Sequence, residues 1–502
     1  MERTRSAGLR LALVIAIPIL AFISLGAWAL SSPVASSPDD DFHLPAIWCG
    51  IGDRPGLCES PTGEPTSTDR YVPAAIPTAP CYAFHDTQSG ACWNPNQPGM
   101  ARVTRANIDH LYPPVFYAAM APLATKNIEA SVIAMRFVNA AFIVGVLTAV
   151  FFALPRRLRP ALLVSALAAS VPLGLFLLAS TNPSSWAILS AAIVWICCYG
   201  ALTTEGRRRY VLIGLSILGA VIGGGARADA AIFAVFGAVV AVCLAYRSWR
   251  RQRSALIGVV AVIVVSAAFY ASARQSGATL GGLGTDAAPL TFAQNVSNFL
   301  EVPQLWTGAL GSWGLGWLDT TMPAAVWVLT TAVFAGAIFI GLRSASRTKL
   351  LMVLLAFTAI WIVPFVMLYL SHATVGNQVQ PRYILPLMII LLGVASAPNS
   401  DQRTEGGHHL AVGAAALAGT AAIALQFDIR RYTTGVDKHG IDPGSGAEWW
   451  WPAAPSPLAV WLIGALAFAL MLGLMWWFSR RADGPLLDTT DTVEIAASAG
   501  DS

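Results

Sequence analysis

Long runs of apolar residues, separated by short polar segments, recur along the whole chain. A helix that crosses a bilayer needs about 20 predominantly apolar residues. Twelve runs come close to this length and predict twelve membrane-spanning helices, of which the fifth and tenth are the shortest. They cover residues 11–30, 130–154, 161–180, 184–203, 210–225, 229–246, 255–273, 323–342, 350–371, 383–397, 409–426 and 457–478. The pattern therefore predicts an all-α polytopic membrane protein with a single membrane domain over residues 1–480.

Composition excludes most other classes of protein. Of 502 residues, 56% are hydrophobic and 12% are charged, about half the charged fraction of ordinary soluble domains. This is too little charge to cover a water-soluble globule of this size. The net charge of +4, spread over the chain, also gives no indication of a nucleic-acid partner. The expected partner is the lipid bilayer.

The placement of charge predicts the orientation in the membrane. Clusters of arginine occur in alternate connections, at 155–160, 204–210, 247–254 and 343–349. With the connection 398–408 and the two ends of the chain, the segments on this side hold 19 Lys and Arg against 9 Asp and Glu, whereas the rest of the chain holds 12 against 18, so the net charges are +10 and −6. The positive-inside rule makes the basic side cytoplasmic. We therefore expect a bacterial inner-membrane protein with both termini in the cytoplasm.

The two ends of the chain allow simple interpretations. Small residues follow the first apolar run, as they would at the cleavage site of a signal peptide. However, that run exceeds the 7–15 apolar residues of a signal peptide, which favours an uncleaved anchor. The segment 481–502 is polar and acidic, and is predicted to be a disordered cytoplasmic tail.

Three extracytoplasmic loops are expected, at 31–126, 274–322 and 428–456. The first is too long for a simple connection, and it holds Cys49, Cys58, Cys81 and Cys92. An even number of cysteines in an oxidising compartment predicts two disulfides. Cys49–Cys58 with Cys81–Cys92 is the simplest of three pairings. A zinc site is the alternative, although no CxxC spacing supports it.

The densest group of chemically active residues follows the first apolar run. It contains Asp39, Asp40, Asp41 and His43, at the membrane surface where a lipid-linked substrate would present its headgroup. Adjacent carboxylates can act as a base and a charge stabiliser, or can together hold a divalent cation such as Mg²⁺ or Mn²⁺. A solvated acidic turn is the alternative.

Several other polar groups are predicted close to the same surface. His110, Tyr112 and Tyr117 precede the second run, where an interfacial aromatic belt is the alternative interpretation. Asn182 opens the fourth run, where helix capping is the alternative. Asp319 ends a segment rich in glycine and tryptophan.

Charged residues at membrane depth are costly and usually face a cavity or a partner. Arg227 and Asp229 form the turn between the fifth and sixth runs, and could be a structural pair. Arg136, inside the second run, and Arg382, at the start of the tenth, have no acidic residue nearby in the sequence. Both are therefore candidates to bind a phosphate or pyrophosphate.

Six short motifs, in this order, resemble the bacterial domain-of-unknown-function 2142 family, and the resemblance covers residues 38 to about 461. The chain departs from the family pattern at Asp40, where glutamate is usual, and at Pro381, where glycine is usual. The motifs are Pro38-Asp39-Asp40-x-x-His43, His110-x-Tyr112-Pro113-Pro114 with Tyr117, Asn182-Pro183, Arg227-x-Asp229, Gly316-Trp317-Leu318-Asp319-Thr320 and Gln380-x-Arg382-Tyr383-x-x-Pro386.

This family is often likened to the GT-C glycosyltransferases, and the resemblance implies a function. Such enzymes take a sugar from a polyprenyl-phosphate or polyprenyl-pyrophosphate donor, with a catalytic acid in the first outer loop and, typically, inversion of the anomeric centre. Asp39 or Asp40 would then be the general base for an envelope glycan or protein acceptor. Arg382, with Arg136 or Arg227, would stabilise the leaving phosphate. The residues expected to shape the substrate site are His43, His110, Tyr112, Tyr117, Asn182, Asp229, Asp319 and Tyr383.

Two other functions fit the same topology. Twelve spans are also common in transporters, so a flippase for lipid-linked sugars is the first alternative. Transporters of that kind tend to have internal repeats and interrupted helices in matching halves, and no such repeat is visible here. A non-catalytic protein of envelope assembly is the second alternative.

Overall fold

The computed structural model describes residues 2–64, 66–283, 288–343, 345–398 and 407–480, so the predicted tail at 481–502 lies outside the described residues. Within these ranges, ten helices are long and apolar enough to cross a membrane, and each coincides with one of the predicted runs. The all-α polytopic prediction is therefore confirmed. The ten helices are α1 (Glu2–Leu30), α4 (Ile128–Ala153), α7 (Ser184–Thr203), α8 (Gly206–Ala226), α9 (Ala228–Ala245), α10 (Trp249–Ser272), α14 (Ala324–Leu342), α15 (Arg347–Leu370), α17 (His408–Thr433) and α18 (Pro457–Ser479).

The other two predicted runs form shorter helices. Residues 161–180 divide into α5 (Arg159–Ala168) and α6 (Leu173–Leu178), because Pro172 lacks an amide hydrogen and restricts the residue before it. The run 383–397 forms the twelve-residue α16 (Leu385–Ser396), which is buried along Leu385–Ala395. Hydropathy alone does not distinguish a helix buried in protein from one buried in lipid, so about twelve spans were predicted and ten helices of spanning length are found in the described part of the chain.

Helix α7 lies at the centre of the bundle, with 89% of its span buried. Gly219 and Gly223, four residues apart on α8, face it: a Cβ atom on Gly223 would lie 2.4 Å from the Cβ of Ser190. Small residues at this spacing let two membrane helices approach closely. On another side of α7, Gly393 of α16 leaves room for the Trp195 indole. A Cβ atom on Gly393 would lie 2.4 Å from this ring. These glycines thus allow the helices at the centre of the bundle to pack closely against α7.

The end of α6, just before α7, is held by one side chain. Asn139, buried in α4, donates from Nδ2 to the carbonyl oxygens of Leu178 at 3.3 Å and Ser180 at 3.0 Å, and its Oδ1 accepts from Trp186 Nε1 at 3.0 Å. Interrupted helices at membrane depth need such partners for their free backbone groups. Asn139 therefore fixes the chain just before α7 begins.

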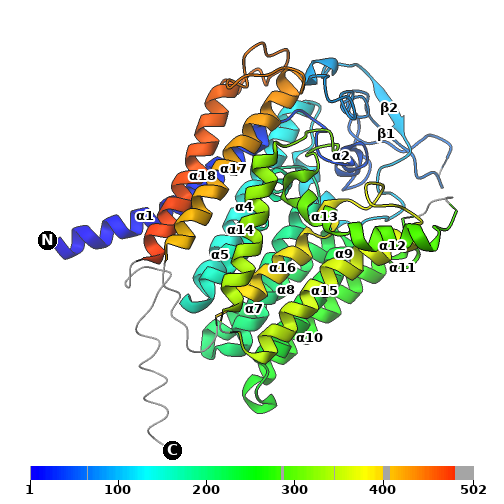
Figure 1. The fold of residues 1–502 in the computed structure, drawn as a ribbon. Coiled ribbons are helices and arrows are strands. Elements are labelled where there is room, and N and C mark those ends of the chain that lie inside the picture. Colours follow the sequence, from blue (N-terminus) through cyan, green and yellow to red (C-terminus); the bar gives the residue numbers. More distant parts are fainter. Residues whose placement is uncertain (1, 65, 284–287, 344, 399–406, 481–502) are drawn as a thin grey trace, which may run out of the picture.

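The segment between α1 and α4 folds over one end of the bundle, which we call the loop end (blue in Figure 1). Both predicted disulfides are confirmed, with Cα–Cα distances of 5.3 Å for Cys49–Cys58 and 6.1 Å for Cys81–Cys92. We call the opposite end, which carries the arginine-rich connections, the arginine end. The segment between α1 and α4 contains α2 (Asp40–Trp48), the antiparallel strands β1 (Arg70–Pro73) and β2 (Met100–Val103), η1 (Gly90–Cys92), α3 (Val115–Met120) and η2 (Ala121–Leu123).

The remaining short helices lie in the connections between the long ones. Those after α10 form part of the second predicted loop, and η5 comes just before α16. They are η3 (Arg156–Leu158), α11 (Gln275–Gly281), α12 (Phe292–Glu301), α13 (Pro303–Thr307), the π-helical turn η4 (Gly308–Ser312) and η5 (Pro381–Tyr383).

Candidate functional site

A buried arginine binds the segment 31–38, which connects α1 to α2. Arg136 donates from Nη1 to the carbonyl oxygens of Ala29 (2.9 Å) and Ser32 (2.6 Å), and from Nη2 to that of Pro33 (2.6 Å) and to Ser36 Oγ (3.0 Å). Its side chain is 1% exposed. Three of these four contacts go to this connection and the fourth goes to the last turn of α1, so we assign Arg136 to positioning the loop rather than to binding phosphate.

Asp39 stands at the start of α2 in an unusual backbone conformation. Its φ is 60°, its side chain makes no capping bond, and its carbonyl oxygen accepts from the backbone amides of Phe42 and His43, each at 2.9 Å. The carboxylate is therefore free to meet Arg382 of η5, with 2.5 Å between Oδ2 and Nη2. The Asp39 side chain is 31% exposed and that of Arg382 is 2% exposed. This pair presents an accessible carboxylate on a buried cation.

The charges around Asp39 keep it ionised. Burial alone would raise the pKa of this carboxyl, but the positive charge and hydrogen bond of Arg382 outweigh burial and lower it to about 2. Arg382 also donates from Nη1 to the Pro38 carbonyl at 3.0 Å, while its Nε has no partner among the described residues. The guanidinium thus has a donor left for a ligand.

Asp40 is oriented into the protein instead. It is fully buried, its Oδ2 accepts from the Ser37 amide at 3.1 Å, and the Thr181 hydroxyl donates to both carboxyl oxygens at 3.4 Å. Burial raises its pKa to about 7, despite the opposing charge of Arg136. Of the two predicted candidates for the general base, Asp39 is therefore the one that a substrate can reach.

The raised pKa of Asp40 predicts a pH-dependent stability. Because the folded protein binds this proton more tightly than the unfolded chain, with pKa values of about 7 and 3.8, the stabilisation is complete below pH 3.8 and is lost as pH rises through 7. The difference corresponds to at most about 4 kcal/mol. We expect Asp40→Asn to flatten the fall in thermal midpoint between pH 5 and 8 in detergent. Parallel pH profiles for the variant and the natural protein would contradict the assignment.

An aromatic wall stands beside the Asp39–Arg382 pair. His43 is fully buried, and its Nδ1 lies 2.9 Å from the Tyr117 hydroxyl of α3. The Tyr112 ring packs edge-on against His43 at 5.4 Å between centroids. Burial lowers the pKa of His43 to about 3, so the imidazole is neutral, and its Nε2 has no partner in the described part of the chain.

A second buried arginine completes this group. Arg227, between α8 and α9, forms two bonds with Asp229, at 2.9 Å from Nε and 2.8 Å from Nη2. Its guanidinium lies over the rings of Tyr112 at 5.6 Å and Tyr383 at 5.3 Å. Tyr383 also lies beneath Arg382, at 5.2 Å. We call the set Asp39, His43, Tyr112, Tyr117, Arg227, Asp229, Arg382 and Tyr383 the Asp39 centre.

Three of the predicted site residues have other surroundings. Asn182 is fully buried and donates to the Pro38 carbonyl at 2.8 Å, so it positions the residue before Asp39. Asp319 pairs with the buried Arg431 of α17 at 2.9 Å. His110 is exposed, and its backbone carbonyl accepts from the amide of Arg274 at 3.0 Å.

Sequence reasoning missed two arginines that hold neighbouring acidic residues. Arg431 binds Asp319 and also the carbonyl oxygens of Tyr82 at 3.0 Å and His85 at 3.1 Å. Arg105 pairs with Asp41 at 2.5 Å. The run Asp428-Ile-Arg-Arg at the end of an apolar segment was a usable signal for the first. The second has no signal, since 64 residues separate its partners.

The donor set does not gather the ligands that a divalent cation prefers. The carboxylate of Asp39 meets Arg382 and that of Asp40 meets Thr181, so the two adjacent residues have different partners. In the residues that the structure describes, no group of three or more His, Cys, Asp or Glu side chains is placed to hold a metal ion. The Asp39 centre instead places two buried guanidinium groups beside one accessible carboxylate.

The chain resembles one family over most of its length. The family model "Predicted membrane protein (DUF2142)" matches residues 22–391, a range that includes every residue of the Asp39 centre. Neither the curated proteins nor the solved structures contain a match to the chain.

Proposed function

The chain belongs to the DUF2142 family of predicted membrane proteins, and from the geometry of the Asp39 centre we propose that it is a membrane glycosyltransferase of the GT-C kind. It would transfer a sugar from a polyprenyl-phosphate donor to an envelope glycan or protein. One observation carries the proposal: an accessible carboxylate is paired with a buried arginine, Asp39 with Arg382, where apolar helices meet a polar loop segment.

The chemistry follows from the two charges. Asp39 would take the proton of an acceptor hydroxyl as its oxygen forms a bond to the anomeric carbon of the sugar. The bond between that carbon and the phosphate oxygen would break at the same time, which inverts the anomeric centre and releases the lipid phosphate. Arg382 and Arg227 would stabilise the negative charge on the leaving phosphate, because buried guanidinium groups bind phosphate oxygens strongly.

Arg382 would couple donor binding to activation of the base. Paired with Arg382, Asp39 has a pKa of about 2 and is a weak base. A phosphate that draws the guanidinium away would remove the charge that holds this pKa low. The carboxylate would then become a stronger base only once a donor is bound.

The proposed location is the bacterial inner membrane, with the loop end outside the cytoplasm and both termini inside. The two disulfides at the loop end support this orientation, because disulfides persist in oxidising compartments. The basic connections at the arginine end support it independently. Lipid-linked sugars and their acceptors would then meet the Asp39 centre from the outer leaflet.

A flippase for lipid-linked sugars is the second candidate. The observation that favours it is the interrupted segment of α5 and α6, since transporters often bind substrate at broken helices. Against it, the free carbonyl groups at the end of α6 are bound by Asn139, and the polar groups gather at the loop end rather than at the midplane.

Turnover distinguishes the two functions. Purified protein would be incubated in detergent with a panel of polyprenyl-phosphate sugars and envelope acceptors, and free lipid phosphate would be measured. We expect release only when donor and acceptor are both present. If no donor is cleaved, while vesicles containing the protein move a labelled lipid-sugar unchanged between leaflets, the transferase proposal is wrong.

A further inference from the structure

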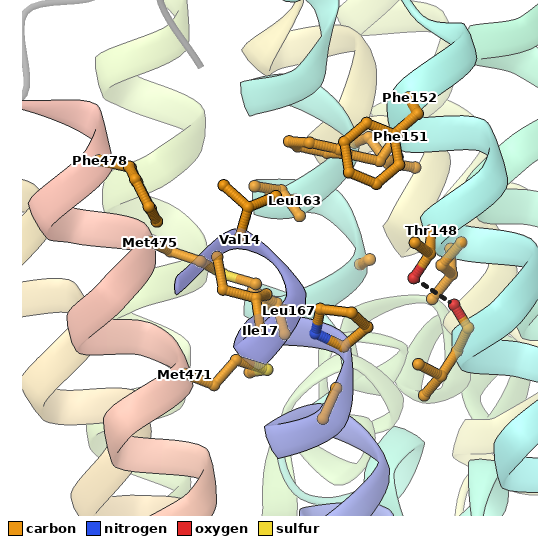
Figure 2. Close-up of a pocket in the computed structure, with 16 residues that line it drawn as sticks. Val14, Ile17, Thr148, Phe151, Phe152, Leu163, Leu167, Met471, Met475 and Phe478 are labelled. Atoms are coloured by element: carbon orange, nitrogen blue, oxygen red, sulfur yellow. Dashed lines mark hydrogen bonds between the residues drawn. The ribbon is translucent and has the colours of Figure 1, made fainter. Parts of the chain in front are cut away.

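An apolar cavity, partly open to its surroundings, lies in the half of the bundle nearer the arginine end, and Figure 2 shows the side chains that line it. Its volume is about 130 Å³, and α1, α4, α5 and α18 form its walls. The lining is hydrocarbon, thioether and aromatic except for Thr148, whose hydroxyl already donates to the Val144 carbonyl of its own helix at 2.7 Å. A ligand in this cavity therefore has no polar group to meet.

The size and surroundings of the cavity indicate what it can hold. An apolar cavity of roughly 150 Å³ stays dry and binds a molecule the size of benzene, so this one fits several methylene groups. Three of its four walls, α1, α4 and α18, are helices of membrane-spanning length. The medium beside them is consequently the hydrocarbon region of the bilayer, and a lipid chain is the hydrocarbon at hand.

Positive charge adjoins the cavity on the same side. Arg159 is 7% exposed and lies over the rings of Phe151 at 4.8 Å and Phe152 at 5.9 Å, and both phenylalanines line the cavity. Arg157 is exposed just before it. Arg480 is exposed two residues after Phe478, another lining residue, and packs on Trp476 at 5.3 Å.

The segment that carries Arg157 and Arg159 is free of acidic residues. The sequence contains no Asp or Glu between Glu129 and Glu205, a range that includes α4, α5 and the turn between them. Arginines at the ends of membrane helices bind the phosphate groups of anionic lipids. A cavity for a chain and a cationic rim for a headgroup thus occur together.

We propose that this cavity, with Arg157 and Arg480, binds an anionic phospholipid of the bilayer. One hydrocarbon chain would enter between α1 and α18, and the headgroup phosphate would lie at the arginine end. The proposal is independent of the function proposed for the Asp39 centre, because no residue is shared. The selectivity between lipids would come from charge. A zwitterionic lipid would fit the cavity equally well but would leave the arginines without an anionic partner.

Native mass spectrometry of the purified full-length chain tests the proposal. The protein would be released from mixed micelles that contain equal amounts of phosphatidylglycerol and phosphatidylcholine. We expect a retained phosphatidylglycerol, preferred by about 30-fold for two surface arginines. Ala166→Phe, which fills the cavity from α5, is expected to abolish retention, and the double variant Arg157→Gln with Arg480→Gln to abolish only the preference.

The matched control is Arg250→Gln, an exposed arginine at the same end of the bundle but on α10, which is expected to change neither quantity. Unaltered thermal midpoints would show that the variants are folded. The proposal is overturned if the two lipids are retained equally by the natural protein, or if Ala166→Phe retains phosphatidylglycerol as the natural protein does.

Discussion

Replacing Asp39 by asparagine is expected to lower the rate of sugar transfer by about 10²–10⁴-fold, the range that loss of a general base produces. Asparagine is nearly the same size and tolerates a positive φ as aspartate does, so the left-handed backbone at this position (φ 60°) is retained. The change is thereby confined to the charge and to the proton acceptor. The measurement is release of lipid phosphate at saturating donor, with the thermal midpoint recorded in parallel.

Asp41→Asn is the matched control for this prediction. Asp41 lies two residues further along and pairs with Arg105 rather than with Arg382, and its side chain is 33% exposed, close to the 31% of Asp39. We expect its activity to stay within a fewfold of the natural protein. Equal activity of Asp39→Asn and Asp41→Asn would remove Asp39 from the mechanism.

Replacing Arg136 by methionine is expected to produce the largest loss of stability. Methionine fills much of the space but offers no donor, so the carbonyl oxygens of Ala29, Ser32 and Pro33 would remain buried without their partner. Each unpaired buried polar group costs about 1–3 kcal/mol, and together we expect a loss of about 3 kcal/mol or more. Unfolding by SDS in mixed micelles measures the difference in free energy.

Two further variants interpret that result. Arg136→Lys keeps the charge but has no planar fork to reach all four acceptors, so we expect intermediate stability. Arg207→Met, at an exposed arginine of α8, should leave stability nearly unchanged. If Arg136→Met were as stable as Arg207→Met, the positioning role would be wrong.

Hydropathy predicted the long helices well, because bilayer thickness sets their length and apolar composition directly. It could not predict that residues 161–180 divide, or that α16 ends after twelve residues. Both segments are apolar, yet α6 and α16 are buried within the protein. Lipid and protein interior select the same residues, so composition does not separate them.

The candidate site was predicted in part. Sequence placed Asp39, Asp40 and Arg382 among the important residues, and the structure brings Asp39 and Arg382 together across 343 positions. It could not separate Asp39 from Asp40, because the difference lies in one positive φ that turns adjacent side chains in different directions. Arg136 was predicted to bind phosphate because it has no acidic residue nearby in the sequence. Its partners in the structure could not be predicted, since they are backbone carbonyls more than 100 residues away.

The pairing of the cysteines, in contrast, was predicted correctly from the sequence. Cys49–Cys58 and Cys81–Cys92 are separated by 9 and 11 residues, and these short separations made this pairing the simplest of the three that four cysteines allow. Contacts across the bundle, such as that between Arg431 and Asp319, depend on how the helices pack, which no local pattern encodes.

The measurement that tests the central claim most directly is a structure of the natural protein with a non-cleavable phosphonate analogue of a polyprenyl-phosphate sugar. We expect the phosphonate to lie within hydrogen-bonding distance of Arg382. The Asp39–Arg382 pair, which is 2.5 Å apart without a ligand, would be separated, and the Asp39 carboxylate would face the acceptor side of the sugar. A phosphonate bound elsewhere, with this pair intact, would contradict it.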